Sequence, residues 1–232
     1  MEKICADMGL AQPGHWEQTF DSPDHIPLLS AYANWPRLEG EGPGVKRLGR
    51  YYDALAQRWQ RRWAGPLLER ATPAVAEGAR PWRAGLDFTV TYAQDGLLSL
   101  WWEAWEDTGE RRRRRLRRGD TWRMPQGDVV TLPELLPPSR RWRRRVLSAA
   151  AEQIQARLEA GESVFYEDWP KRLAREFVPA QFYLSPAGQV TVFYQMETIA
   201  PALEGFPSFC LGPVANPPLP SLEEQASPGG RL

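Results

Sequence analysis

A strongly alternating segment near the middle of the chain places the tightest constraint on the fold. Between residues 86 and 92, Leu86, Phe88, Val90 and Tyr92 alternate with polar residues, and a second apolar run spans residues 97–105. A period of two is typical of strands that bury one face. The Ala-Gln-Asp-Gly sequence between the runs favours a tight turn. The segment therefore predicts an antiparallel hairpin.

A second hairpin is indicated near the end of the chain. Residues 180–194 contain two short runs of aromatic and β-branched residues, joined by Ser-Pro-Ala-Gly at 185–188. Pro186 and Gly188 supply the backbone geometry that a turn needs. The chain then leaves the hairpin through Ile-Ala-Pro at 199–201.

Three segments have the apolar period of amphipathic helices. The first begins at Val45 and reaches Gly65-Pro66, which interrupts or ends it. The second spans about 140–159, with Ser139 as its N-cap and a glycine after its end. A short third helix covers about 169–177 and leads into the second hairpin.

The order of these segments predicts an α+β fold, with an antiparallel sheet of hairpins and helices packed on one face. Weaker strand patterns lie at 27–35, 120–124 and 128–132. The predicted organisation has three parts. Residues 1–26 form a flexible lead-in, residues 27–212 form one α+β domain, and residues 213–232, rich in Pro, Gly, Ser and Glu, form a disordered tail.

The chain shows no pattern typical of a catalytic, cofactor or metal site. Its two cysteines, Cys5 and Cys210, lie at opposite ends and make no metal spacing. His15 and His25 stand apart from any acidic cluster, and no phosphate loop or dinucleotide fingerprint occurs. Without a signal sequence or a run of about 18 apolar residues, we expect a soluble cytoplasmic protein with no membrane span.

Charge is balanced overall but is distributed unevenly. The net charge is zero, yet thirteen arginines and only four acidic residues lie between positions 110 and 145. Arg111, Arg113 and Arg115, with Trp122 as a stacking partner, are candidates for binding an acidic protein or nucleic acid. The simpler interpretation is a solvated strand edge and helix start, because edge strands often carry charge.

Other aromatic and acidic residues have simple structural interpretations. The tryptophans of the central region (Trp59, Trp63, Trp101, Trp102 and Trp105) are expected mainly in the core. The possible acid–base groups (Glu103, Glu106, Asp107, Glu167, Asp168 and Glu197) show no paired spacing, so solvated or capping roles are expected.

The second hairpin also resembles a known protein family. Its aromatic strand at 182–184, the Ser-Pro-Ala-Gly turn, the strand at 192–194, Ile-Ala-Pro at 199–201 and Gly205 resemble the C-terminal signature of the RsiV-like family. This family comprises the ectodomain shared by the anti-sigma-V factor RsiV and the N-terminal region of the peptidoglycan deacetylase PdaC. Residues 120–122 and 127–136 resemble a second element of the family, and the resemblance covers about 27–212.

The resemblance implies a non-catalytic α+β domain that binds a protein, which for RsiV is lysozyme. The best candidate surfaces for such a partner are the Arg/Trp segment (Arg111, Arg113, Arg115 and Trp122) and the loop at 185–188, including Ser185 and Gly188. The family's Gly-Gly-Ala-His-Gly element is replaced here by Thr-Gly-Glu-Arg-Arg at 108–112. The alternatives are a cell-wall enzyme or accessory domain, as for PdaC, and nucleic-acid binding through the Arg-rich segment.

Overall fold

Two β-sheets organise the protein in the computed structural model, which describes residues 12–109 and 113–215. The larger sheet has the strand order β1-β2-β3-β4-β5-β6, and the smaller has the order β7-β8-β9. The strands of the larger sheet are β1 (Gly14–Asp21), β2 (Pro27–Trp35), β3 (Trp82–Gln94), β4 (Leu97–Asp107), β5 (Arg114–Arg123) and β6 (Asp128–Val129). The strands of the smaller sheet are β7 (Phe182–Leu184), β8 (Gln189–Phe193) and β9 (Ser208–Pro213).

The predicted α+β fold is confirmed, and both predicted hairpins are present as β3–β4 and β7–β8. Every pairing is antiparallel except that of β2 with β3, which run parallel. A parallel pair needs a long crossover connection, and here the helical segment between the two strands supplies it. The sequence pattern gave no sign of this pairing. Residues 29–33 of β2 pair with residues 82–86 of β3, and the whole helical segment separates the two strands in sequence.

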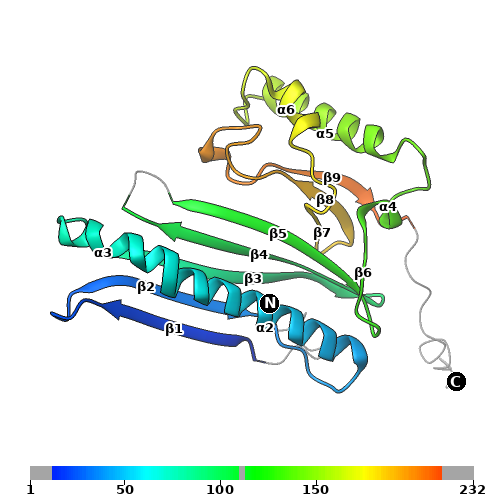
Figure 1. Ribbon diagram of the computed structural model, residues 1–232. Helices are drawn as coiled ribbons and strands as arrows, with labels where there is room; N and C mark the ends of the chain where they lie inside the picture. Colours follow the sequence, from blue (N-terminus) through cyan, green and yellow to red (C-terminus); the bar gives the residue numbers. More distant parts are fainter. Residues whose placement is uncertain (1–11, 110–112, 216–232) are drawn as a thin grey trace, which may run out of the picture.

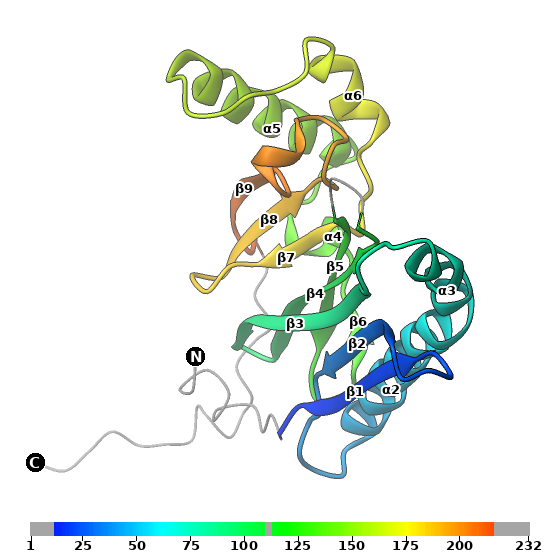
Figure 2. The same cartoon turned by 90° about the vertical axis from the view of Figure 1, so that its left-hand side faces the viewer.

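One long helical segment covers a face of the larger sheet (Figure 2). It consists of α2 (Pro43–Arg62), the π-helical turn η1 (Trp63–Leu67) and α3 (Leu68–Ala76). Pro66 lacks an N–H and its ring would clash with the carbonyl of Arg62 in an α-helix, so the helix widens there. Trp63 and Tyr52 are fully buried between this segment and the sheet.

The smaller sheet lies against the opposite face of the larger one, and carries its own helices on its outer side (Figures 1 and 2). These are α5 (Trp142–Glu159) and α6 (Trp169–Arg175), while α4 (Leu132–Leu135) and the 3-10 turn η2 (Ala202–Glu204) lie in the connections. β7 crosses β5 so closely that the main chain of Phe182 contacts Gly119. The buried hydroxyl of Ser99 on β4 accepts a 2.9 Å hydrogen bond from the N–H of Leu184. These contacts join the two sheets.

Three expectations about segments need correction. Residues 14–21 of the predicted flexible lead-in form β1, because their backbone pairs along its length with β2. The predicted strand at 128–132 ends at Val129, since Thr131 and Glu134 form a capping box that starts α4. Position 213 of the predicted tail belongs to β9, and the tail residues from 216 onward lie outside the described part of the chain.

None of the helices in the described residues is long and apolar enough to cross a membrane.

Candidate binding surface at the β5 edge

The Arg-rich run is itself a strand, β5, although only its last residues were predicted to be one. It pairs along its whole length with β4, and Arg117 stands opposite Glu103. Opposite charges on facing positions of two strands stabilise the pairing. On its other side, β5 pairs with β6 only at Trp122 and Arg123. Most of the outer edge of β5 is therefore not covered by a neighbouring strand.

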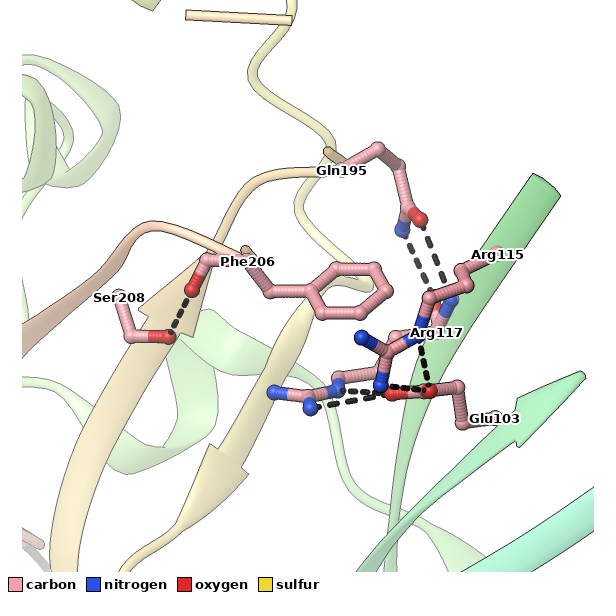
Figure 3. Close-up of polar contacts among 6 residues, drawn as sticks. All are labelled: Glu103, Arg115, Arg117, Gln195, Phe206 and Ser208. Atoms are coloured by element: carbon pink, nitrogen blue, oxygen red, sulfur yellow. Dashed lines mark hydrogen bonds and ion pairs between the residues drawn. The ribbon is translucent and has the colours of Figure 1, made fainter. Parts of the chain in front are cut away.

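Glu103 is the centre of an ion cluster on the face of β4 and β5 that turns toward the smaller sheet (Figure 3). Its carboxylate accepts a 2.7 Å hydrogen bond from Nε of Arg115 and a 3.1 Å bond from Nη2 of Arg117. The guanidinium of Arg117 lies between two aromatic rings, 4.3 Å from the centre of Trp101 and 4.2 Å from that of Phe206. The prediction that Glu103 is solvated is wrong, because only 6% of it is exposed.

Glu106 and Asp107, at the end of β4, are also buried. The prediction that these two carboxylates are solvated is therefore wrong as well. Glu106 receives hydrogen bonds of 2.6 and 2.9 Å from Arg62. Asp107 pairs with Arg80 at 2.7 Å and with Arg113 at 3.2 Å. Burial alone would raise the pKa of Asp107, but the N–H of residue 109 and the two guanidinium groups hold that pKa below its ordinary value.

Asp120 occupies the opposite face of β5, under α2. Its Oδ2 accepts a 3.1 Å hydrogen bond from Nε1 of Trp102, and the hydroxyls of Tyr51 and Tyr52 lie 3.4 Å away. Arg118 approaches Oδ1 at 3.5 Å. Burial raises the pKa of Asp120, while Arg118 and the three neutral donors oppose the rise.

The buried acids and the outer arginines give this region a cationic exterior. In the part of the chain that the structure describes, ion pairs join four buried carboxylates (Glu103, Glu106, Asp107 and Asp120) to six arginines (Arg62, Arg80, Arg113, Arg115, Arg117 and Arg118). All of these arginines except Arg117 are partly open to solvent, whereas the carboxylates lie beneath them. A partner that approaches β5 therefore meets guanidinium groups first.

Exposed apolar side chains accompany these arginines. Leu116 on β5, Val129 on β6 and Leu203 on η2 are 43%, 64% and 78% exposed. Leu203 borders a hollow of about 410 Å³ that Arg113 and Arg115 also line. Leu116 borders a neighbouring hollow, which shares Arg115. The β5 edge surface is defined here as Arg113, Arg115, Leu116, Arg118 and Leu203, whereas Val129 lies at the far end of β5, opposite Trp122.

The site residues that were predicted from the sequence lie in different parts of the structure. Arg113 and Arg115 belong to the β5 edge surface, while Arg111 lies outside the described residues. Trp122 is in the core, where its Nε1 donates a 2.8 Å hydrogen bond to the hydroxyl of Tyr52, so its predicted role as a surface stacking partner is wrong. The alternation of side chains along β5 turns it toward α2.

Ser185 and Gly188 are far from the arginines, at the β7–β8 turn. The Gly188 N–H donates to the carbonyl oxygen of Ser185 at 2.8 Å, and a positive φ of 69° explains the need for glycine. The turn packs against Tyr92 near the end of β3, whereas Arg113 precedes the start of β5, at the other end of the sheet. The arginines at the start of α5 are also separate, because α5 lies beyond the smaller sheet (Figure 2).

Sequence reasoning missed Leu116, Val129, Leu203 and Gln195. Each is an ordinary residue in its local sequence, and only the fold brings it to the edge of β5. The Gln195 side chain bonds to both backbone groups of Arg117, at 3.1 and 2.7 Å, across 78 positions of sequence. No local pattern signals such a contact.

The fold is similar to that of two solved proteins of the DUF3298 family. The structure is similar to that of a DUF3298 family protein from Pseudomonas aeruginosa, with a TM-score of 0.57 and 15% identity over 88% of this chain and 90% of the other. A DUF3298 family member from Bacteroides fragilis gives a TM-score of 0.64 and 11% identity over 88% and 91%. No family model and no curated protein matches the sequence. At these identities the likeness establishes the fold alone.

Proposed function

We propose that this chain is a non-catalytic, protein-binding domain of the RsiV-like family, and that its partner docks on the β5 edge surface. The observation that carries the proposal is that exposed Leu116 and Leu203 border hollows that share Arg115, beside the other guanidinium groups of this edge. Apolar side chains together with arginines are typical of protein interfaces.

A protein partner fits this surface better than nucleic acid. The arginines at this edge are already paired with Glu103, Asp107 and Asp120, and the carboxylates of a partner protein would meet the same competition as phosphates, so the apolar side chains decide between the two. The phosphate backbone, which supplies most of the affinity for nucleic acid, would make no favourable contact with the exposed leucines. A protein with acidic and apolar residues matches both features of the surface.

A binding role also fits better than catalysis. Glu103 and Asp107 each accept hydrogen bonds from two guanidinium groups of the same domain, so their carboxylate oxygens are engaged by these donors and not presented to a substrate. Asp120, whose pKa is raised, is surrounded by neutral donors of the core, with no second acid among them. The acidic residues are thus explained by the stability of the sheet.

Site-specific photo-crosslinking tests the proposal. A photoreactive benzoylphenylalanine is placed at Leu116, and in a second protein at Ile26, an exposed apolar residue of the β1–β2 turn near the opposite edge of the sheet. Each is irradiated with purified lysozyme, the partner that the RsiV resemblance implies, and with a lysate of the source organism. We expect a discrete adduct from position 116 and none from position 26.

Two arginine variants provide a matched control. Arg113 and Arg80 both pair with Asp107 and are similarly exposed, but only Arg113 borders the hollow with Leu203. Arg113→Gln should reduce the yield of the adduct, whereas Arg80→Gln should leave it unchanged. Equal adducts from positions 116 and 26, or no adduct at all, would contradict the proposed function.

A further inference from the structure

The first strand of the larger sheet has one edge without a neighbouring strand. β1 is the terminal strand of this sheet (Figure 1), and among the described residues it pairs with β2 alone. Half of the N–H and C=O groups of such a strand point outward, away from its neighbour. An edge of this kind accepts a further strand unless charged residues, proline or a covering segment prevents it.

β1 lacks the residues that usually protect an edge. Its sequence, Gly-His-Trp-Glu-Gln-Thr-Phe-Asp, contains no lysine, arginine or proline, whereas β5 at the other side of the sheet carries a row of arginines. Trp16 and Phe20 remain half-buried, although both pack against the core under the helical segment. Trp16 stacks on Trp63 with the ring centres 6.1 Å apart. The edge of β1 is therefore uncharged by basic residues and partly apolar.

Two copies of β1 are able to pair antiparallel in only a few registers. Alternate residues of a strand direct their backbone groups to opposite sides, so the numbers of two facing residues must differ by an even number. The pairing is then symmetric about one residue, which faces its own counterpart. With Glu17 at the centre, two Glu17 carboxylates would face each other, and with Thr19 at the centre Glu17 would face Asp21. Like charges in facing positions are unfavourable, so both registers are disfavoured.

A register centred on Gln18 has no such conflict. Trp16 of one copy would face Phe20 of the other, which brings two half-buried rings together on the face that the helices cover. On the opposite face His15 would stand across from the carboxylate of Asp21, to which its ring N–H is able to donate. Aromatic pairs and complementary polar pairs in facing positions both stabilise a sheet.

The prolines on either side of β1 favour the same centre. Pro13 and Pro23 flank the strand and are equally far from Gln18 in sequence. Proline has no N–H to donate, so it interrupts pairing along an edge. In the register centred on Gln18 the two prolines would face each other beyond the ends of the paired strands. Any shift of the centre would bring a proline opposite a residue of β1.

We propose that two copies of this chain join antiparallel through β1, in the register centred on Gln18, so that their larger sheets become one continuous sheet. A two-fold axis passes between the two Gln18 residues, and the same surface serves both copies. Ile26 lies outside the paired residues. The interface is small, so we expect a dissociation constant in the micromolar range. The inference is independent of the proposed function, which concerns the β5 edge surface.

Sedimentation equilibrium of two lysine variants tests the inference. Gln18 and Thr19 are exposed neighbours on β1. Gln18→Lys would place two ammonium groups opposite each other, so it should weaken the dimer by about 5-fold or more. Thr19→Lys would place the same charge opposite Glu17 of the other copy, so it should strengthen the dimer by about 2–5-fold. A wild type that stays monomeric up to millimolar concentration, or equal weakening by both variants, would overturn the inference.

Single cysteines determine the register directly. In a chain whose own cysteines are replaced (Cys5→Ser and Cys210→Ser), a cysteine is introduced at position 17, 18 or 19, and the thiol crosslinker dibromobimane is added. We expect Gln18→Cys to give a covalent dimer by itself, because this residue faces its own counterpart. Glu17→Cys and Thr19→Cys should give one efficiently only when the two proteins are mixed. A covalent dimer that forms fastest from Glu17→Cys alone or Thr19→Cys alone, or from none of these proteins, would contradict the proposed pairing.

Discussion

Replacement of Gly119 by alanine tests the crossing of the two sheets, where the main chain of Phe182 on β7 contacts β5. A methyl group on Gly119 would overlap the carbonyl oxygen of Phe182 and lie only 2.8 Å from its carbonyl carbon. Ordinary contacts between carbon atoms are about 3.5–4.0 Å, so β7 would have to retreat by about 1 Å. No flexible side chain is present to absorb the shift, because the obstacle is main chain.

The cost follows from what that retreat would break. Overpacking of a core costs about 1–3 kcal/mol, and loss of the hydrogen bond from Leu184 to the buried Ser99 hydroxyl adds about 1 kcal/mol. We therefore expect Gly119→Ala to lower the free energy of unfolding by about 2–4 kcal/mol. For a protein of this size the midpoint of thermal unfolding should fall by about 4–16 °C.

The control is the same substitution at Gly49, in the middle of α2. A methyl group there would meet no atom within 4 Å, and the residue is helical. Gly49→Ala should stabilise the protein by about 0.5–1 kcal/mol, because alanine loses less backbone entropy on folding. Both variants are measured by urea unfolding followed by tryptophan fluorescence. If Gly119→Ala is as stable as Gly49→Ala, β7 does not cross β5 at this distance.

Two further predictions concern the buried acids. Glu103→Gln should lower the free energy of unfolding by about 2–4 kcal/mol, because it leaves the guanidinium groups of Arg115 and Arg117 facing each other without a counter-charge. The control is Asp128→Asn, which breaks an exposed ion pair with Arg47 and should change the free energy of unfolding by less than about 1 kcal/mol in the same urea assay. Similar losses of stability in both variants would refute the reasoning. Burial raises the pKa of Asp120 above its ordinary value of 3.8. Above that pH the unfolded chain releases the proton of this carboxyl, while the folded protein still keeps it. The resulting contribution to stability is complete below the ordinary pKa and is lost as the pH rises through the higher pKa of the folded state. The stability of the wild type relative to Asp120→Asn should therefore decrease as the pH rises above 3.8 in urea unfolding, whereas a difference independent of pH would contradict the assignment.

Local patterns were sufficient to predict most of the elements. The alternation in residues 86–105 and the Ser-Pro-Ala-Gly turn predicted the two hairpins because a strand period and a turn depend on neighbouring residues. The apolar stripe from Val45 likewise predicted α2. The strand character of the Arg run could not be predicted in this way, since charged residues there become strand only by pairing with Glu103 and its neighbours on β4.

The residues of the candidate site were predicted from the sequence only in part. Arg113 and Arg115 were predicted to be surface residues because of their charge, but Trp122 was placed beside them and is buried instead. An alternating pattern tells which residues of a strand share a face, but it does not tell which of the two faces other elements cover. That choice was made by α2, which packs on the side of β5 that carries Trp122.

The sequence by itself determined the α+β composition, the hairpins and the high local density of arginine, all of which follow from residues close together in the chain. Only the tertiary structure decided that the arginines lie over buried carboxylates, and that exposed Leu116 and Leu203 lie in hollows that share Arg115. The physical reason is distance in sequence: Gln195 reaches Arg117 across 78 positions, and Phe182 of β7 reaches Gly119 across 63 (182 − 119). Burial and pairing of this kind arise from packing between elements that are distant in sequence. A pattern within a short stretch of sequence therefore cannot predict them.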